Sequence, residues 1–355
     1  MKYIHGILTT LAAGLLLAAC SADSASVENE LPQAQFILNG SIYSEATTRS
    51  VNTALQTTKI AVGNTVGAFI LRKGETAAQT VDGEAYGYLN KEFTSVDATT
   101  QLYSPEQPLF PAKGTGDQKK VDIYAYAPRN AAWTSLAAQT FTVKADQTSD
   151  ANYIASDLLW GTRSGNVDPT DPAPTYTGSA EHDGGTLSYQ LVPFRFRHML
   201  TQIQINVTAG DGVSASDLKG TTVKLINAGN TGSIDLTDGT ITQTGKANYI
   251  DVFKYGYKQD GTTEDASCTG GVAIVYPHTA AQLAGTVDSK PVKVQLTFNS
   301  FTFSASLATA NITEWEQYKK YTYNVRISSD GISFSAAISP WDTSEADRPV
   351  TPVFQ

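Results

Sequence analysis

The amino-acid sequence predicts an all-β protein with two β-sandwiches in tandem, and three observations support this. Short runs of β-branched and aromatic residues recur along the chain, with turn signals between them. Helical periodicity is almost absent, so the chain lacks the alternation of strands and helices that marks α/β folds. The length of 355 residues, 41% of them hydrophobic, suits two ordinary domains with packed cores.

The chain opens with a secretory signal that ends at a cysteine. Lys2 precedes an apolar run, residues 7–17, which is too short for a bilayer span of about 20 apolar residues. Residues 17–20, LAAC, look like a bacterial lipobox, in which Cys20 becomes the lipid-modified first residue. Its acyl chains would hold the protein on a membrane surface. The alternative is an ordinary secretory signal with an incidental cysteine.

One strand and one arginine lie between Cys20 and the main body. Residues 21–33, SADSASVENELPQ, are polar and acidic and predict a solvated tether. Residues 36–38, FIL, predict a single strand. Arg49, the first lysine or arginine after Lys2, follows in the stretch SEATTRSVN, whose composition suits an exposed loop that a protease could cut. The alternative is a surface arginine in a linker.

Hairpins and single strands are predicted in the main body. Apolar residues alternate from Tyr321 to Ile338 with a turn at Asp330-Gly331, and Asp238-Gly239 marks a second hairpin. A tight turn or bulge is expected at Asn299-Ser300. Further strands are expected at residues 67–71, 121–128, 139–143 and 270–277.

A long loop divides the two predicted domains. Residues 162–186 are dense in Gly, Pro, Asp, Ser and Thr and have no apolar period. We therefore assign residues 1–19 to the signal peptide, 20–49 to the tether and first strand, 50–185 to an N-terminal domain with its trailing loop, and 186–355 to a C-terminal domain. The alternative is one large domain with an insertion.

Residues that could carry catalysis or bind a cofactor are not grouped in the sequence. The net charge of −9, without any basic cluster, argues against nucleic-acid binding. His182, His198 and His278 have no second ligand at metal-site spacing, and no G-x-S-x-G motif is present. His198 is expected to face the core, in a strand whose apolar phase slips at residues 201–202 and so predicts a bulge. We expect no enzymatic activity, catalytic residue, metal or cofactor.

Several stretches, in their order along the chain, resemble the fimbrillin family of Bacteroidales, the subunits of type V pili and related surface adhesins. They are the lipobox, the early TR dipeptide, LFPAKGTGDQKKVDIYAYAP, SDLLWGT, FRFRHMLTQIQINV and YTYNVRISSDGISFSAAISPW. The resemblance implies two transthyretin-like β-sandwich domains, a palmitate-type lipid on Cys20, and a lipoprotein exposed on the cell outer membrane.

The resemblance also implies a route of assembly. An arginine-specific protease would cut between Arg49 and Ser50 and remove the first strand. Donor-strand exchange with a C-terminal segment, ISFSAAISPW or the tail DRPVTPVFQ, would then join subunits head to tail in a fimbrium. Host or bacterial surface ligands would be further partners.

A second hypothesis from another class is a surface lipoprotein that binds glycans. It would use exposed tyrosines and tryptophans, such as Trp133 and Trp160. A metal-dependent surface hydrolase is a third class, and the lack of clustered ligands argues against it.

Overall fold

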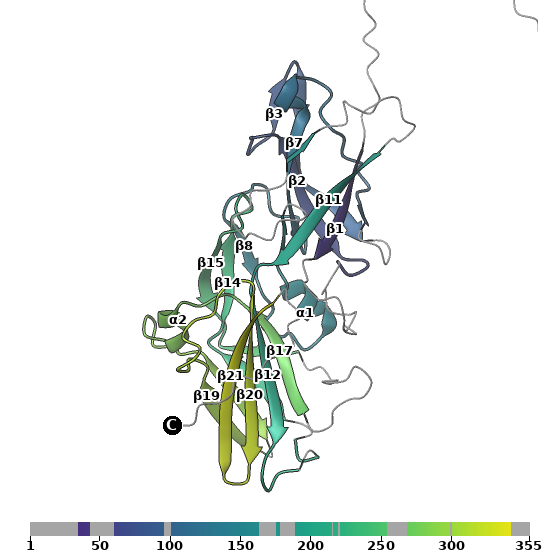
Figure 1. The fold of residues 1–355 in the computed structure, drawn as a ribbon. Helices are drawn as coiled ribbons and strands as arrows, with labels where there is room; N and C mark the ends of the chain where they lie inside the picture. The colour runs from purple at the N-terminus through teal and green to yellow at the C-terminus, as the bar shows by residue number, and fades with distance from the viewer. Residues whose placement is uncertain are drawn as a thin grey trace, which may run out of the picture. The chain divides into compact units, whose positions relative to one another are not determined.

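In the computed structural model, β-strands dominate the chain (Figure 1). The structure describes residues 35–42, 60–95, 101–162, 175–177, 189–214, 216–218, 221–253, 268–298 and 300–341. Helical structure in these ranges is limited to η1 (Gly116–Lys119), α1 (Asp150–Ser156) and α2 (Ala280–Ala284). Neither α1 nor α2 has the length or the apolar composition to cross a bilayer. The all-β prediction is confirmed.

The first sheet closes into a ring of strands. Its order is β10-β7-β2-β5-β6-β1-β11-β9, and β9 also pairs with β7, so the ladder returns to its start. The small hairpin β3 (Gln79–Val81) and β4 (Glu84–Tyr86) stands apart from this ladder. The strands of the ring are β1 (Gln35–Ile42), β2 (Thr65–Arg72), β5 (Tyr88–Ser95), β6 (Gln101–Tyr103), β7 (Lys120–Ala127), β9 (Leu159–Thr162) and β11 (Tyr189–His198), with β10 (Thr175–Thr177) added beside β7.

Strands β2 and β7 are buried on both faces, and each face belongs to a different core. In β2, Ala68 and Ile70 pack into the core of the ring, whereas Phe69 and Leu71 pack into a second cluster. Because both faces of a strand buried in this way are apolar, its sequence is a nearly continuous hydrophobic run rather than an alternating one. This accounts for the runs GAFIL and VDIYAYA in the sequence.

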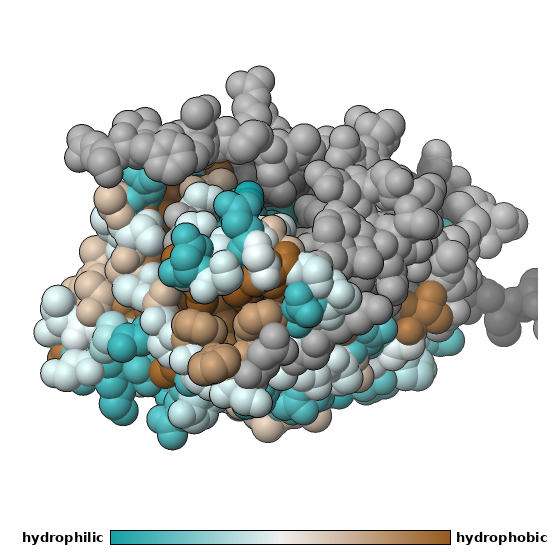
Figure 2. Space-filling view, turned by 90° about the horizontal axis from the view of Figure 1, so that it is seen from below, coloured by the Kyte–Doolittle hydropathy of each residue, from teal (hydrophilic) through white to brown (hydrophobic). Residues whose placement is uncertain are grey.

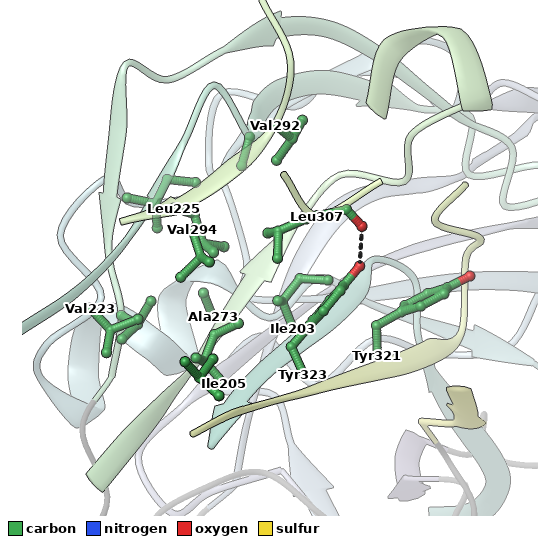
Figure 3. Close-up of a cluster of buried hydrophobic side chains, with 14 of the residues drawn as sticks. Ile203, Ile205, Val223, Leu225, Ala273, Val292, Val294, Leu307, Tyr321 and Tyr323 are labelled. Carbon is green, nitrogen blue, oxygen red and sulfur yellow. Dashed lines mark hydrogen bonds between the residues drawn. The ribbon is translucent and has the colours of Figure 1, made fainter. Parts of the chain in front are cut away.

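Two four-stranded sheets form a sandwich in the C-terminal half. One has the order β17-β12-β20-β21 and the other β16-β13-β18-β19. Side chains from both sheets, among them Ile205, Leu225 and Val294, fill the space between them (Figure 3). The strands are β12 (Thr201–Ala209), β13 (Thr222–Ile226), β16 (Tyr249–Asp251), β17 (Cys268–Val275), β18 (Lys293–Phe298), β19 (Phe301–Ser306), β20 (Lys319–Ser328) and β21 (Gly331–Pro340).

The polar ends of aromatic side chains in this core are hydrogen-bonded. The Tyr323 hydroxyl donates to the backbone oxygen of Leu307 at 2.8 Å and accepts from the Trp315 indole N–H at 2.9 Å. Since an unpaired polar group in an apolar core costs free energy, these two bonds allow a large aromatic pair to be fully buried.

A third sheet links the two halves of the sequence. It has the order β15-β14-β8, so β8 (Gln139–Thr142) pairs with β14 (Gly229–Ile234), which in turn pairs with β15 (Ile241–Lys246). The Trp160 indole N–H donates to the backbone oxygen of Leu236 at 3.0 Å within the second apolar cluster. Neither half is therefore built only from its own residues.

Most expected strands and hairpins are confirmed, with two local corrections. Strand β20 pairs with β21, β14 with β15, and β18 with β19. The first of these hairpins pairs Ser328 with Gly331, so its two-residue loop lies one position before the predicted turn. The predicted bulge at residues 201–202 is wrong. Strand β11 ends at His198 and β12 begins at Thr201 in another sheet, so the apolar phase changes because the chain changes sheets.

The division into two domains stays a prediction. Strand β11 follows the predicted boundary at residue 185, and it pairs with β1 and β9 of the first sheet. The chain leaves this sheet only after His198.

Gln147 is expected to contribute strongly to stability. It is fully buried, and its side chain bonds both backbone groups of Ile274, each at 2.8 Å. Gln147→Ala should lower the free energy of unfolding by about 2–4 kcal/mol, because two buried backbone groups lose their partners. Urea denaturation measures the change. Gln79→Ala, at an exposed position, is the matched control and should change stability by less than about 0.5 kcal/mol.

His278 should make stability depend on pH. In the buried ring, Nδ1 donates to the backbone oxygen of Tyr276 at 2.8 Å, and Nε2 accepts from the backbone N–H of Gly229 at 3.1 Å. Because one nitrogen donates and the other accepts, the ring is held neutral. Burial lowers the pKa of His278 from about 6.5 to about 4. Because the folded-state pKa is lowered, the contribution of the neutral His278 ring to the free energy of unfolding is complete above pH 6.5 and is lost as the pH falls towards 4.

Between pH 7.5 and pH 4.5 the wild type should lose about 2–3 kcal/mol more than His278→Gln, as measured by urea denaturation at each pH. Equal losses in the two proteins would contradict this role of the imidazole.

Candidate functional site

Strand β1 occupies an interior position in the first sheet, between β6 and β11. It runs parallel to β11 over eight residue pairs, from Gln35–Tyr189 to Ile42–Phe196. On its other side it is antiparallel to β6, where Leu38 pairs with Leu102 and Asn39 with Gln101. The first described strand therefore closes the ring of strands.

Two side chains of β1 enter the core of the ring. Leu38 is 0% exposed and lies between its ladder partners Leu102 and Val192, which are also buried. Ile42 is 3% exposed and lies beside Phe196. Side chains alternate between the faces of a strand, so these two residues, four apart, point to the same side. We call the space that β1 fills, bounded by β6 and β11, the β1 slot.

The predicted strand at residues 36–38 is confirmed and is longer than expected. The predicted lipidation residue Cys20 and the predicted cleavage residues Arg49 and Ser50 lie outside the described residues. Arg49 belongs to residues 43–59, which connect β1 to Ile60 in the sequence. A cut after Arg49 would therefore break the backbone between β1 and the later strands of the ring.

The end of β11 meets the last described residue of the chain. The Trp341 ring stacks on the His198 ring with a centroid distance of 4.3 Å. The backbone N–H of Trp341 donates to the backbone oxygen of Tyr318 at 2.7 Å. His198 is 4% exposed, and its Nδ1 bonds Asp157 Oδ1 at 2.7 Å, so the prediction of a core-facing, hydrogen-bonded histidine is confirmed. Trp341 therefore lies at the C-terminal end of β11, two positions beyond the last ladder pair with β1.

Two tryptophans named for glycan binding are not available for it. Trp133 is 4% exposed and Trp160 is fully buried. Their use as a binding platform is therefore a wrong prediction, because both rings fill the second apolar cluster. In the described part of the chain, no group of three or more histidine, cysteine, aspartate or glutamate residues could hold a metal ion.

The walls of the slot could not be found from the sequence. Residues Leu102 and Val192 lie far from Leu38 along the chain, and the parallel pairing of β1 with β11 has no local turn signal. The alternation in the stretch FRFRH indicated a strand there but gave no partner.

Comparisons with known proteins found relatives in sequence and in structure. A candidate fimbrium subunit of Bacteroides uniformis, Fim1C, is 24% identical in an alignment of 351 positions that covers 95% of each chain. The crystal structure of a candidate cell adhesion protein from Bacteroides uniformis superposes with a TM-score of 0.56 at 19% identity, covering 87% of this chain and 99% of that one. A candidate cell adhesion protein from Bacteroides ovatus gives a TM-score of 0.54 at 15% identity, covering 87% and 98%.

These two crystal structures share the fold of this protein. The family model described as fimbrillin-like matches residues 48–341, which are most of the chain. The protein therefore belongs to the fimbrillin-like family, a family of fimbrial subunits.

Proposed function

We propose that the protein is a structural and adhesive subunit of a surface pilus, assembled by donor-strand exchange after a cut at Arg49 removes β1. The observation that carries the proposal is the position of β1. It is the first of the described strands, yet it completes a closed ring through an eight-residue ladder. A strand that lies between two other strands in the sequence needs a cut on each side to be removed. Because β1 precedes every other described strand, one cut behind it separates it from all of them.

Removal of β1 would leave a site that favours refilling. The apolar surfaces that now contact Leu38 and Ile42 would be exposed to water, and about 1.5–3 kcal/mol of burial free energy would be lost for each of the two side chains. Backbone groups of β11 and β6 would lose their ladder partners, and edges of this kind readily accept another strand. A strand from a second subunit can supply both the hydrogen bonds and the apolar side chains.

The slot defines what a donor strand must look like. A donor that reproduces the contacts of β1 runs parallel to β11 and carries two apolar residues four positions apart, as Leu38 and Ile42 are. In the C-terminal tail, Val350 and Phe354 have this spacing. Strand β21 is the other candidate, but it is already paired with β20 over ten residues. We therefore favour the tail, although Pro352 lacks the N–H that one ladder bond needs.

The proposed maturation begins at the cell surface. A lipid on Cys20 would anchor the uncut subunit to the outer membrane, and the cut after Arg49 would free it from that anchor together with β1. The β1 slot and the proposed donor are different segments of the chain, so repeated exchange between subunits would produce a filament rather than a closed dimer.

Cleavage at Arg49 should start filament formation. Treatment of the purified uncut protein with an arginine-specific protease should release one N-terminal fragment containing β1, followed by filaments visible in electron micrographs. Arg49→Lys should stay uncut at this position and form none, because the protease needs arginine. Arg129→Lys, at a half-buried position that bonds Glu92, is the matched control and should behave as the wild type. Protein cut at Arg49 that never forms filaments would contradict the proposal.

A peptide with the sequence of β1 should inhibit assembly. Residues 33–43, QAQFILNGSIY, added to the cut protein should occupy the β1 slot and lower the filament yield measured by light scattering. The same peptide with Leu38→Ser and Ile42→Ser should lose most of its effect, since about 3–6 kcal/mol of apolar burial is removed. Equal inhibition by the two peptides would show that filament growth does not use the slot.

A further inference from the structure

The C-terminal sandwich has one covered side and one uncovered side. At the covered side, Phe253 exchanges two backbone hydrogen bonds with Val272 of β17, each at 2.8 Å. Residues 145–147 bond the edge strand of the other sheet through Asp251. At the opposite side, β21 pairs only with β20 and β19 only with β18 among the described residues.

Both uncovered edge strands present apolar side chains that face the core. The ladder partners of Phe301 and Phe303 in β19 are Phe298 and Leu296, which point into the sandwich. Phe301 is nevertheless 68% exposed and Phe303 36%. Ile338 in β21 pairs with the buried Tyr321 and is 48% exposed. Figure 2 shows brown and tan side chains uncovered among hydrophilic ones at the lower end of the molecule, where this sandwich lies in Figure 1.

These strands also lack the charges that normally prevent edge pairing, and the one proline in β21, Pro340, is its last residue. Neither FTFSAS in β19 nor GISFSAAISP in β21 contains a charged residue. Natural edge strands usually carry lysine or other charges to block association with further strands. A ten-residue edge without charge, beside exposed apolar side chains, is suited to pairing.

The sequence of β21 is complementary to itself in an antiparallel pair. When the pair is centred on Ser335, Ile332 meets Ile338, Phe334 meets Ala336, and Ser333 meets Ala337. Core-facing Ile332 then meets core-facing Ile338, and small residues meet on the outer face. Pro340 falls outside the paired segment.

We propose that this side of the sandwich binds a second copy of the chain through antiparallel pairing of the two β21 strands about a two-fold axis at Ser335. The axis is perpendicular to the sheet, so it also brings the two β19 strands together in the opposite sheet. Phe301, Phe303 and Ile338 of both copies become covered, and the two sandwiches share one core. Such a contact is isologous and links subunits side by side, separately from a head-to-tail exchange.

The purified uncut protein should be a dimer by native mass spectrometry and sedimentation. Ser335→Asp places two carboxylates opposite each other at the axis and should raise the dissociation constant about fivefold or more. Ser333→Asp, also exposed on β21, meets the neutral Ala337 of the partner and is the matched control, which should weaken the dimer less than Ser335→Asp does. Mixing Ser335→Asp with Ser335→Lys should restore the dimer, as a heterodimer of distinct mass.

Three results would overturn the proposal. They are a monomeric wild type, a Ser335→Asp variant that dimerises like the wild type, or a protein that dimerises only after truncation behind Trp341, which would assign the edge to the chain's own tail. Since the test uses uncut protein, it does not depend on cleavage at Arg49 or on filament formation.

Discussion

The first sheet is a closed ring only while β1 lies between β6 and β11. The constraint behind this is the pairing of backbone groups, since a strand inside a ring serves the ladders on both its sides. Leu38 and Ile42 add apolar contacts to the core that β2, β5 and β7 also line. The element that completes this core is the first of the described strands, and residues 43–59 join it to Ile60 and so to the rest of the ring.

The packing of β2 and β7 explains how the ring is joined to the rest of the molecule. One face of each strand belongs to the core of the ring, and the other belongs to the cluster that contains Trp160, Leu236 and Tyr276. The Tyr276 hydroxyl donates to the Phe141 oxygen at 2.8 Å, and Gln147 bonds Ile274. Buried polar groups that are satisfied in this way fix the relative position of the strands they connect more strictly than apolar contacts do.

The edges of the sheets divide into those that the chain covers itself and those that it leaves open. Residues 145–147 and Phe253 cover one side of the C-terminal sandwich. The β19 and β21 side has no such cover among the described residues. The difference is informative because uncovered, uncharged edges are normally selected against in proteins that do not use them. In a protein of the fimbrillin-like family, whose members assemble, such edges are candidates for contacts between subunits.

The sequence by itself determined the fold class and most strands, because alternation, turn residues and apolar runs are local signals. The hairpin from Lys319 to Pro340 and the strand near Leu38 are examples. Only the tertiary structure decided which strands meet. The pairing of β1 with β11, the change of sheet after His198, the burial of Trp133 and Trp160, and the exposure of Phe301 all depend on contacts between residues far apart in sequence. A periodic pattern shows that a side chain has an apolar face to bury, but the partner that buries it is set by the packing of the whole chain.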